Sequence, residues 1–472
     1  MNRSTDFIPF ARPSVGEEEE QAVLSVLRSG WLTTAGQTQL FEREFAERVG
    51  TTHALAVNSA TAGLHLSLEA IGIGPGDIVL TTPYTFTASA EVARYLGAEV
   101  RFADIEEESL TIDPREVDRV LGEGSDRRGS DTRGSDDSGG GGSGGGGSGG
   151  RGGSAGGKGL GAAAMIPVHL GGRPCRMKEL AEISDRYGVP IVEDAAHAFP
   201  VAYGERCLGT LGATGVYSFY ATKTITTGEG GMVATDDEEL ARRIRTMRLH
   251  GIDREVWNRY TERGASWSYD VVAPGYKYNL PDMAAAVGRV QLGRADEFLR
   301  RRAAIARRYR EAFADLDFLR VPAEPEHTEL PAEPGHTGEP SKPEQSDDAM
   351  PPLHDAQQEA RNRQRQSAAA THAWHLFILR IVEERLDIDR DRFIELLSDE
   401  GIGTSVHYIP LHLMSYYRKT YGFRPEDFPV SLRVYRSALS LPIYPALTDE
   451  QVEKIISAVR RIGEEHYRRV SR

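Results

Sequence analysis

Lys223 follows a short apolar segment and precedes a run of glycines, a setting in which a lysine amine can become reactive. Residues 216–220 (VYSFY) predict a buried strand, because β-branched and aromatic residues fit a buried, pleated surface. A lysine at the end of such a strand is partly desolvated, which lowers the pKa of its amine. The neutral amine can attack a carbonyl carbon and form a Schiff base, and glycines at 228–231 would let the backbone approach a bulky planar cofactor. A structural lysine that caps the strand end is the alternative.

The chain has seven lysines, and the other six lack this setting. Each has a sufficient structural explanation: a low-complexity tract, a solvated helix face, or aromatic neighbours along which its stem can lie. Lys158 and Lys342 lie in low-complexity tracts. Lys178 and Lys454 lie on predicted solvated helix faces, and Lys277 and Lys419 lie beside aromatic residues. Lys223 is therefore the candidate nucleophile.

Two other motifs carry groups that could bind an anion or a cationic ring. Residues 58–63 (NSATAG) follow the predicted strand 53–57 and begin a helix. Small hydroxyl residues cap a helix start, and the free N–H groups there bind anions, although plain capping is the alternative. The predicted strand 189–192 ends in EDAAH, and open α/β sheets bind ligands at the carboxyl ends of their strands. Asp194 could therefore pair with the cationic ring nitrogen of a pyridoxal cofactor; a helix-capping Asp194 and a packed His197 are the alternatives.

Strands and helices alternate along most of the chain, which predicts an α/β fold with a mostly parallel sheet and helices on both faces. The predicted strands are residues 53–57, 77–81, 99–103, 165–169, 189–192, 216–220 and 232–234. The predicted helices are 15–29, 37–49, 58–71, 85–96, 114–121, 174–187 and 236–249, followed by a long helix at 282–315 that should break near 292–298. Beyond it we expect a strand at 372–379, a helix at 390–400, a short strand after 401–407 and a helix at 449–462.

The order of these elements predicts two domains. Residues 1–290 should form a large domain, residues 291–320 a bridging helix, and residues 371–472 a smaller C-terminal α+β domain. Two low-complexity tracts, 121–160 (glycine-rich) and 322–370 (proline-rich), lack the apolar residues of a core. We expect both to be flexible or disordered insertions.

The sequence disfavours several classes of function. A net charge of −14 argues against a nucleic-acid partner. Residues 152–159 nearly match a phosphate-binding loop but lack its Ser or Thr and a preceding strand. No metal site is predicted, since His327 and His336 lie in the proline-rich tract and should be solvated. Two cysteines, Cys175 and Cys207, cannot form a disulfide framework. Without an apolar signal core or a run of about 18 apolar residues, we expect a cytoplasmic protein with no membrane span.

Four motifs, taken in order along the chain, resemble those of the DegT/StrS-type sugar aminotransferases, which are fold-type I pyridoxal phosphate (PLP) enzymes. They are residues 58–63, 193–197, 218–231 and 276–279, and residues 30–36 (GWLTTAG) also resemble the family. The resemblance covers nearly all of the chain outside the two low-complexity tracts. The segments GYKYNL and HAWHLFIL further resemble the branch that makes UDP-4-amino-4-deoxy-L-arabinose.

The resemblance implies a large PLP-binding domain with a seven-stranded sheet and a role for each matching residue around the cofactor ring. Lys223 would bond covalently to the cofactor and then move the proton between substrate and cofactor. Asp194 would keep the pyridine nitrogen protonated. Phe86 would stack on the ring face, and His197 would lie against the ring or its 3′-hydroxyl.

The resemblance also assigns the cofactor phosphate and the substrate. Thr61, Ala62 and Ser218 would bind the phosphate at the helix N-terminus. Asn279 would reach the phosphate of the neighbouring subunit, so the site would need a homodimer. The expected substrate contacts are Trp31, Thr33, Tyr276, Lys277, His375 and His407.

These assignments predict a transaminase that moves an amino group, with glutamate as donor, to a keto group on a nucleotide-linked sugar. A PLP-binding regulator or scaffold without turnover is one alternative. A PLP-dependent sugar dehydratase is another, although related dehydratases replace the lysine with histidine, which Lys223 argues against. A nicotinamide-dependent sugar oxidoreductase would need a G-x-G-x-x-G motif after the first strand, and residues 58–63 lack that spacing.

Overall fold

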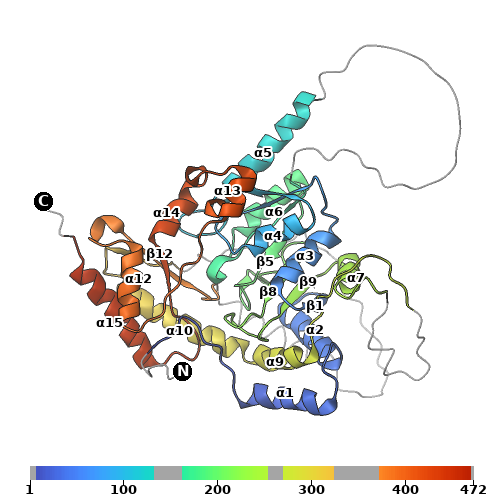
Figure 1. The fold of residues 1–472 in the computed structure, drawn as a ribbon, viewed down its shortest axis with the longest axis horizontal. Helices are drawn as coiled ribbons and strands as arrows, with labels where there is room; N and C mark the ends of the chain where they lie inside the picture. Colours follow the sequence, from blue (N-terminus) through green and yellow to red (C-terminus); the bar gives the residue numbers. More distant parts are fainter. Residues whose placement is uncertain (1–6, 132–161, 254–268, 324–370, 469–472) are drawn as a thin grey trace, which may run out of the picture.

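Short strands form the centre of the molecule (Figure 1), in one group of four and another of three. The structure, a computed structural model, describes residues 7–131, 162–253, 269–323 and 371–468. One group of strands is ordered β1 (His53–Val57), β9 (Gly231–Thr235), β8 (Thr214–Ser218) and β5 (Val192–Asp194); the other is ordered β3 (Glu99–Phe102), β2 (Ile78–Thr81) and β4 (Ala164–Met165). Parallel bridges from Met165 to Ile191 and from Val168 to Asp194 join β4 to β5 and make one sheet.

The sheet is mostly parallel, because β9 is the strand that runs against its neighbours β1 and β8. The pairs β5–β8, β2–β3 and β2–β4 are parallel. The predicted fold class, a mostly parallel seven-stranded sheet flanked by helices, is confirmed.

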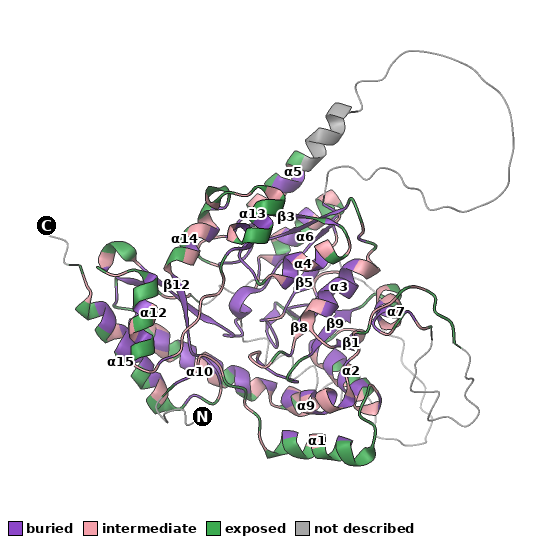
Figure 2. Ribbon diagram, viewed as in Figure 1, coloured by how far each residue is buried: buried purple, intermediate pink, exposed green. Residues whose placement is uncertain are grey.

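Alternate residues of the strands enter cores on opposite faces of the sheet, as the two-residue repeat of a strand requires. Leu55 and Val57 pack with α3 (Ala60–Ala70), α4 (Ala88–Tyr95) and α7 (Glu238–Met247). Ala54 and Ala56 enter the other core, formed with α2 (Gly36–Val49), α5 (Pro114–Asp131), α6 (Met177–Tyr187) and α9 (Asp282–Gly293). Figure 2 shows the buried sheet between these layers and the largely exposed helix α1 (Glu17–Ser29), which packs on α9. None of the helices within the described ranges is long and apolar enough to cross a membrane.

A separate core surrounds a small antiparallel sheet near the C-terminus. Its strands are ordered β10 (Leu319–Arg320), β11 (Phe377–Ile381) and β12 (Ala438–Leu441). Apolar side chains of α10 (Ala295–Phe313), α12 (Arg390–Asp399) and α15 (Asp449–Glu465) pack on it. The predicted break in the long helix is confirmed, since α9 ends at Gly293 and α10 begins at Ala295. The division of the chain into domains at 290 and 371 stays a prediction.

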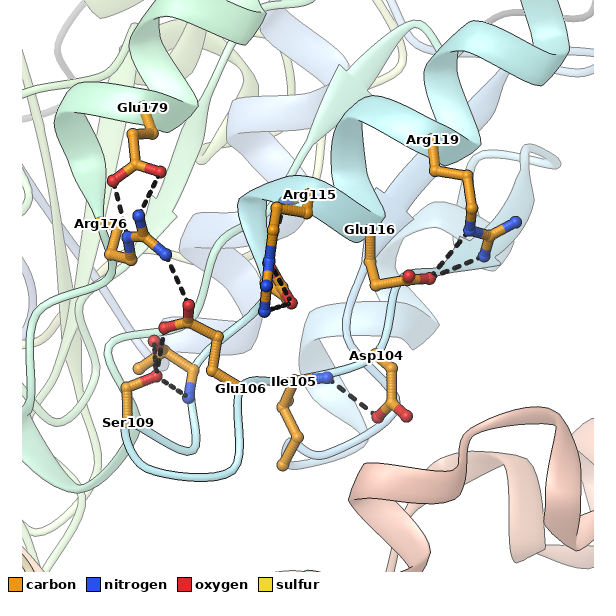
Figure 3. Close-up of polar contacts among 11 residues, drawn as sticks. Asp104, Ile105, Glu106, Ser109, Arg115, Glu116, Arg119, Arg176 and Glu179 are labelled. Carbon is orange, nitrogen blue, oxygen red and sulfur yellow. Dashed lines mark hydrogen bonds and ion pairs between the residues drawn. The ribbon is translucent and has the colours of Figure 1, made fainter.

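Polar contacts fix the loop that follows β3 (Figure 3). Arg176, just before α6, pairs with Glu106 (2.6 Å) and with Glu179. On the other side of the loop, the buried Asp104 carboxylate accepts the backbone N–H groups of Val430 (2.9 Å) and Ser431 (3.0 Å) at the start of α14 (Pro429–Ser437). The helix-capping contact is the stronger restraint, because exposed ion pairs contribute little free energy.

Residues 371–376 are not a strand, although a strand was predicted from residue 372. The segment instead lies across the turn at Gly171 and Gly172, whose carbonyls accept the N–H groups of His375 and Ala373 at 2.9 Å. The same turn is close to the end of the preceding described segment, since Arg173 Nη1 donates to the Ala323 carbonyl at 3.1 Å. The described chain therefore stops at residue 323 and resumes at residue 371 beside the same turn, at Gly171–Arg173.

Two other predictions need correction. The short strand expected after residues 401–407 is absent from this described part of the chain, where isolated bridges join Ile402 to Ile8 and Ser405 to Ser440. The glycine-rich tract was placed from residue 121, but the backbone of α5 continues as a helix to Asp131. The rest of that tract (132–161) and residues 324–370, with the near-match at 152–159 and both histidines of the proline-rich tract, lie outside the described residues.

Candidate active site

A cavity of about 560 Å³ opens where β5 and β8 end and where α3 begins, and we call it the Lys223 cavity. The predicted residues that line it are Thr61, Phe86, Asp194, His197, Ser218, Lys223 and His407. Other residues complete the wall, among them Phe10, Tyr220, Glu229, Ser405 and Tyr408. Its size is in the usual range for small-molecule sites.

Lys223 lies on a turn after β8 rather than at the strand end, because β8 ends at Ser218. Its own N–H donates to the Tyr220 carbonyl at 2.9 Å, and Thr226 Oγ1 donates to the Phe219 carbonyl at 3.0 Å, which fixes the turn. Burial lowers the pKa of the Lys223 amine to about 8, although the Asp194 carboxylate opposes this shift. About one amine in ten is then neutral at pH 7, far more than for an ordinary lysine.

We expect the reactivity of this amine to follow its lowered pKa. In the cofactor-free protein, the rate at which Lys223 reacts with an aldehyde should rise with pH and level off above about pH 8, since the neutral amine is the nucleophile. Borohydride trapping followed by peptide mapping measures this rate at Lys223. Lys178 is the internal control, because it is exposed on α6 and lies outside the cavity. A Lys223 midpoint near pH 10.5 would contradict the lowered pKa.

Asp194 ends β5 at the floor of the cavity, and two groups fix its carboxylate. Ser89 Oγ donates to Oδ2 at 2.7 Å, and the Ala196 N–H donates to Oδ1 at 3.1 Å. Thr85 Oγ1 in turn lies 2.9 Å from Ser89 Oγ. A carboxylate whose two oxygens both accept hydrogen bonds is suited to hold a cation or an N–H donor beside it.

The N-terminus of α3 lies directly against the ends of β8 and β9. Ser59 caps the helix, since its Oγ accepts the Ala62 N–H at 3.1 Å. Glycine is required beneath the helix: a Cβ at Gly231 would lie 2.7 Å from Ala60 N, and one at Gly63 would lie 2.7 Å from Val216 Cγ1. This close packing brings the N–H groups of the first turn to the cavity that Thr61 and Ser218 line.

His197 is held from two sides. Its Nδ1 accepts the Gly171 N–H at 3.2 Å, and its Nε2 lies 3.3 Å from Tyr408 Oη. The ring of His375 stacks on it with centroids 4.4 Å apart. Burial, together with the positive charge of Lys223 and a contribution from His407, keeps the pKa of His197 well below its ordinary value. The imidazole is therefore neutral at physiological pH.

The opposite wall comes from the two ends of the chain. His407 Nδ1 lies 2.9 Å from Ser440 Oγ, and its ring stacks on Phe10 at 5.2 Å. Phe10 is placed by the neighbouring Ile8, which pairs with Ile402. Phe86 is 57% exposed at the cavity, with its ring 6.1 Å from that of Tyr408. Phe10 and Tyr408 were not predicted from the sequence. The position of Tyr408 next to His407 could have indicated it, but no feature of the sequence indicates Phe10.

Several predicted residues do not line the Lys223 cavity of this chain. Asn279 lines a separate cavity of about 210 Å³ and donates to Thr34 Oγ1 at 2.6 Å, and Lys277 bonds to the Asn279 side chain. Tyr276 stacks on Tyr278 at 5.1 Å. Ala62 is buried in α3, and Trp31 and Thr33 lie in the loop before α2. His375 lies behind His197. Across the described part of the chain, no group of three or more His, Cys, Asp or Glu side chains could hold a metal ion.

A sequence model described as the DegT/DnrJ/EryC1/StrS aminotransferase family matches residues 13–133, 151–335 and 349–460. The chain belongs to this family. A relative in this aminotransferase family, the spore coat polysaccharide biosynthesis protein SpsC of Bacillus subtilis, is 38% identical over 463 residues, which cover 98% of each chain.

Solved structures agree with the family and confirm the predicted fold type. The aminotransferase TlmJ from Streptoalloteichus hindustanus is 30% identical, with a TM-score of 0.73 over 97% of this chain and 99% of that one. Spr1654 of Streptococcus pneumoniae, a proposed sugar aminotransferase, is 27% identical in its PLP form, with a TM-score of 0.74 and the same coverage. This DegT/DnrJ/EryC1/StrS chain therefore has the fold of PLP-dependent aminotransferases.

Proposed function

We propose that this chain is a PLP-dependent aminotransferase that moves the amino group of L-glutamate to a keto group on a nucleotide-linked sugar. The observation that carries the proposal is the pair formed by Lys223, with its lowered pKa, and the fixed carboxylate of Asp194, both at one cavity. Family membership supplies the reaction class. Sugar as the substrate class is supported by the names of relatives such as SpsC and Spr1654.

The residues of the cavity fit the chemistry of PLP. Lys223 would hold its aldehyde carbon, and Asp194 its ring nitrogen. The first turn of α3, with Thr61, Ala62 and Ser218, would hold the phosphate. Phe86 would cover the ring face, and His197 would lie against the ring or its 3′-hydroxyl. Each part of the cofactor thus has a group of suitable chemistry in or beside one cavity.

When bound, PLP supplies an electron sink that stabilises the negative charge left on a substrate carbon after proton removal. Lys223 Nζ, neutral in part at physiological pH, would take the proton from that carbon and carry it as the general acid–base of the site. The Asp194 carboxylate, fixed by Ser89 and the Ala196 N–H, would keep the ring nitrogen protonated. The aromatic rings of Phe86, Phe10 and Tyr408 would supply apolar walls beside the reacting atoms.

We further propose that the active form is a cytoplasmic homodimer. Asn279, Lys277, Tyr276, Trp31 and Thr33 lie away from the Lys223 cavity of their own chain. In a dimer they would complete the cavity of the partner, with Asn279 directed at the phosphate and the others at the sugar nucleotide. His407 and His375 would serve the cavity of their own chain. The identity of the sugar and the proposed likeness to the 4-amino-4-deoxy-L-arabinose branch stay predictions.

An absorbance spectrum of the purified protein tests this function. We expect a band near the visible edge that moves to shorter wavelength when L-glutamate is added, because the amino group then resides on the cofactor. A keto-sugar nucleotide added afterwards should restore the first band. A band that ignores glutamate would exclude this donor, and the absence of a band after added PLP would exclude the proposed role of Lys223.

A further inference from the structure

A chain of hydrogen bonds with a fixed direction ends at the Lys223 cavity. The Gly171 N–H donates to His197 Nδ1, and His197 Nε2 lies 3.3 Å from Tyr408 Oη. A backbone N–H can only donate, so Nδ1 carries no proton. A neutral imidazole has one ring proton, which must then be on Nε2 and must point to the Tyr408 oxygen. If Tyr408 donated instead, both ring nitrogens would lack a proton.

The surroundings hold this tautomer in place. The carbonyl of Gly171 accepts the N–H groups of His375 (2.9 Å) and Leu376 (3.2 Å), which fixes the peptide between Gly171 and Gly172, next to the N–H that His197 accepts. The ring of His375 lies against His197 with an interplanar angle of 33°. His197 is 6% exposed, and its lowered pKa excludes the doubly protonated form, which could not accept from Gly171. The direction of the chain is therefore set by backbone structure.

We propose that Tyr408 donates a hydrogen bond to an oxygen atom of the ligand in the Lys223 cavity, and that the Gly171 amide sets this direction through His197. The Tyr408 oxygen accepts from His197, which leaves its own proton for the cavity that Tyr408 lines. Burial, and the nearby Asp194 carboxylate, raise the pKa of Tyr408, so the proton is retained. This inference rests on the proposed function.

Two ligands could supply the oxygen acceptor, and they share its chemistry. One is the ring oxygen of the cofactor, and the other is a carboxylate or keto oxygen of a substrate. The aromatic ring of Tyr408 must stay in place during the test, because it contacts Phe86 and this contact does not involve the hydroxyl. The hydroxyl must therefore be removed while the ring is kept.

The Tyr408→Phe variant makes this change, and Tyr416→Phe is the matched control, since Tyr416 is exposed outside the cavity and its hydroxyl accepts from Arg94. PLP binding to the cofactor-free proteins is measured by fluorescence titration, and the binding of L-glutamate and 2-oxoglutarate to the loaded proteins by absorbance. We expect Tyr408→Phe to weaken one of these by about tenfold, the effect of one lost hydrogen bond. Weaker PLP binding assigns the cofactor oxygen, and weaker substrate binding alone assigns the substrate oxygen. Affinities that match those of Tyr416→Phe in every titration would overturn the proposal.

A second measurement tests the direction of the chain without turnover or cofactor. In protein labelled with ¹⁵N-histidine, the ring nitrogen shifts of His197, assigned by comparison with His197→Gln, should report a proton on Nε2 and none on Nδ1. A proton on Nδ1 would overturn the proposal. Failure of the wild-type protein to take up PLP would instead overturn the proposed function, and the measured tautomer would still decide the hydrogen-bond direction.

Discussion

Replacing Lys223 by alanine abolishes turnover and the cofactor absorbance band while the protein stays folded. The amine is the one group of the cavity that combines a nucleophile with a proton carrier, and its pKa of about 8 suits both tasks. We expect kcat to fall by about 10⁴-fold or more, as when an enzyme loses its nucleophile. Steady-state kinetics and an absorbance spectrum of the variant measure both effects.

Lys178→Ala is the matched control for this change. It removes a lysine from α6, outside the cavity, and should keep the activity and the spectrum of the wild-type protein. Thermal unfolding of both variants separates a chemical loss from misfolding. Normal transamination by Lys223→Ala would refute the proposed function.

Replacing Asp194 by asparagine lowers kcat by on the order of 100-fold or more and leaves the cavity intact. Asparagine has nearly the same shape and keeps an oxygen that can accept from Ser89 or Ala196. What is lost is the negative charge that would keep a ring nitrogen protonated, a preorganised electrostatic contribution of several kcal/mol in comparable sites. Single-turnover kinetics with L-glutamate, followed at the cofactor band, measures the change.

The control here is Asp118→Asn, which removes an exposed carboxylate that pairs with Arg186 on the surface. Its single-turnover rate should equal that of the wild-type protein. A full rate in Asp194→Asn would exclude the proposed role of Asp194 without affecting that of Lys223, because the amine does not need this carboxylate to be nucleophilic.

The sheet and the positions of Asp194 and Lys223 at one cavity were predictable, because local signals specify them. Apolar strands such as 53–57 and helix starts such as 58–63 are encoded by neighbouring residues. The turn after β8 likewise follows from adjacent residues, so Lys223 could be singled out. Strand ends were less predictable. The strand was predicted to end at residue 192, but β5 continues to Asp194, whose backbone pairs with Val216.

Contacts between distant segments could not be predicted in the same way. Phe10 reaches the cavity because Ile8 pairs with Ile402, nearly 400 residues away, and neither sequence indicates the pairing. Residues 372–375 contain apolar and aromatic types typical of a strand, but they bind the turn at Gly171 instead. Trp374 accordingly has a positive φ of 49°, which no strand allows. Tertiary contacts here override local preference.

The single turn at which the chain leaves at residue 323 and returns at residue 371 has an evolutionary consequence. Arg173 and Gly172 hold the two ends of the connection close together. Residues can then be gained or lost between these ends for little more than the entropy of closing a longer loop, about 0.6 kcal/mol for each doubling of length. Duplications such as AEPEHTELP and AEPGHTGEP can therefore accumulate there under weak selection. The same place is suited to the insertion of a reporter domain without disturbing catalysis.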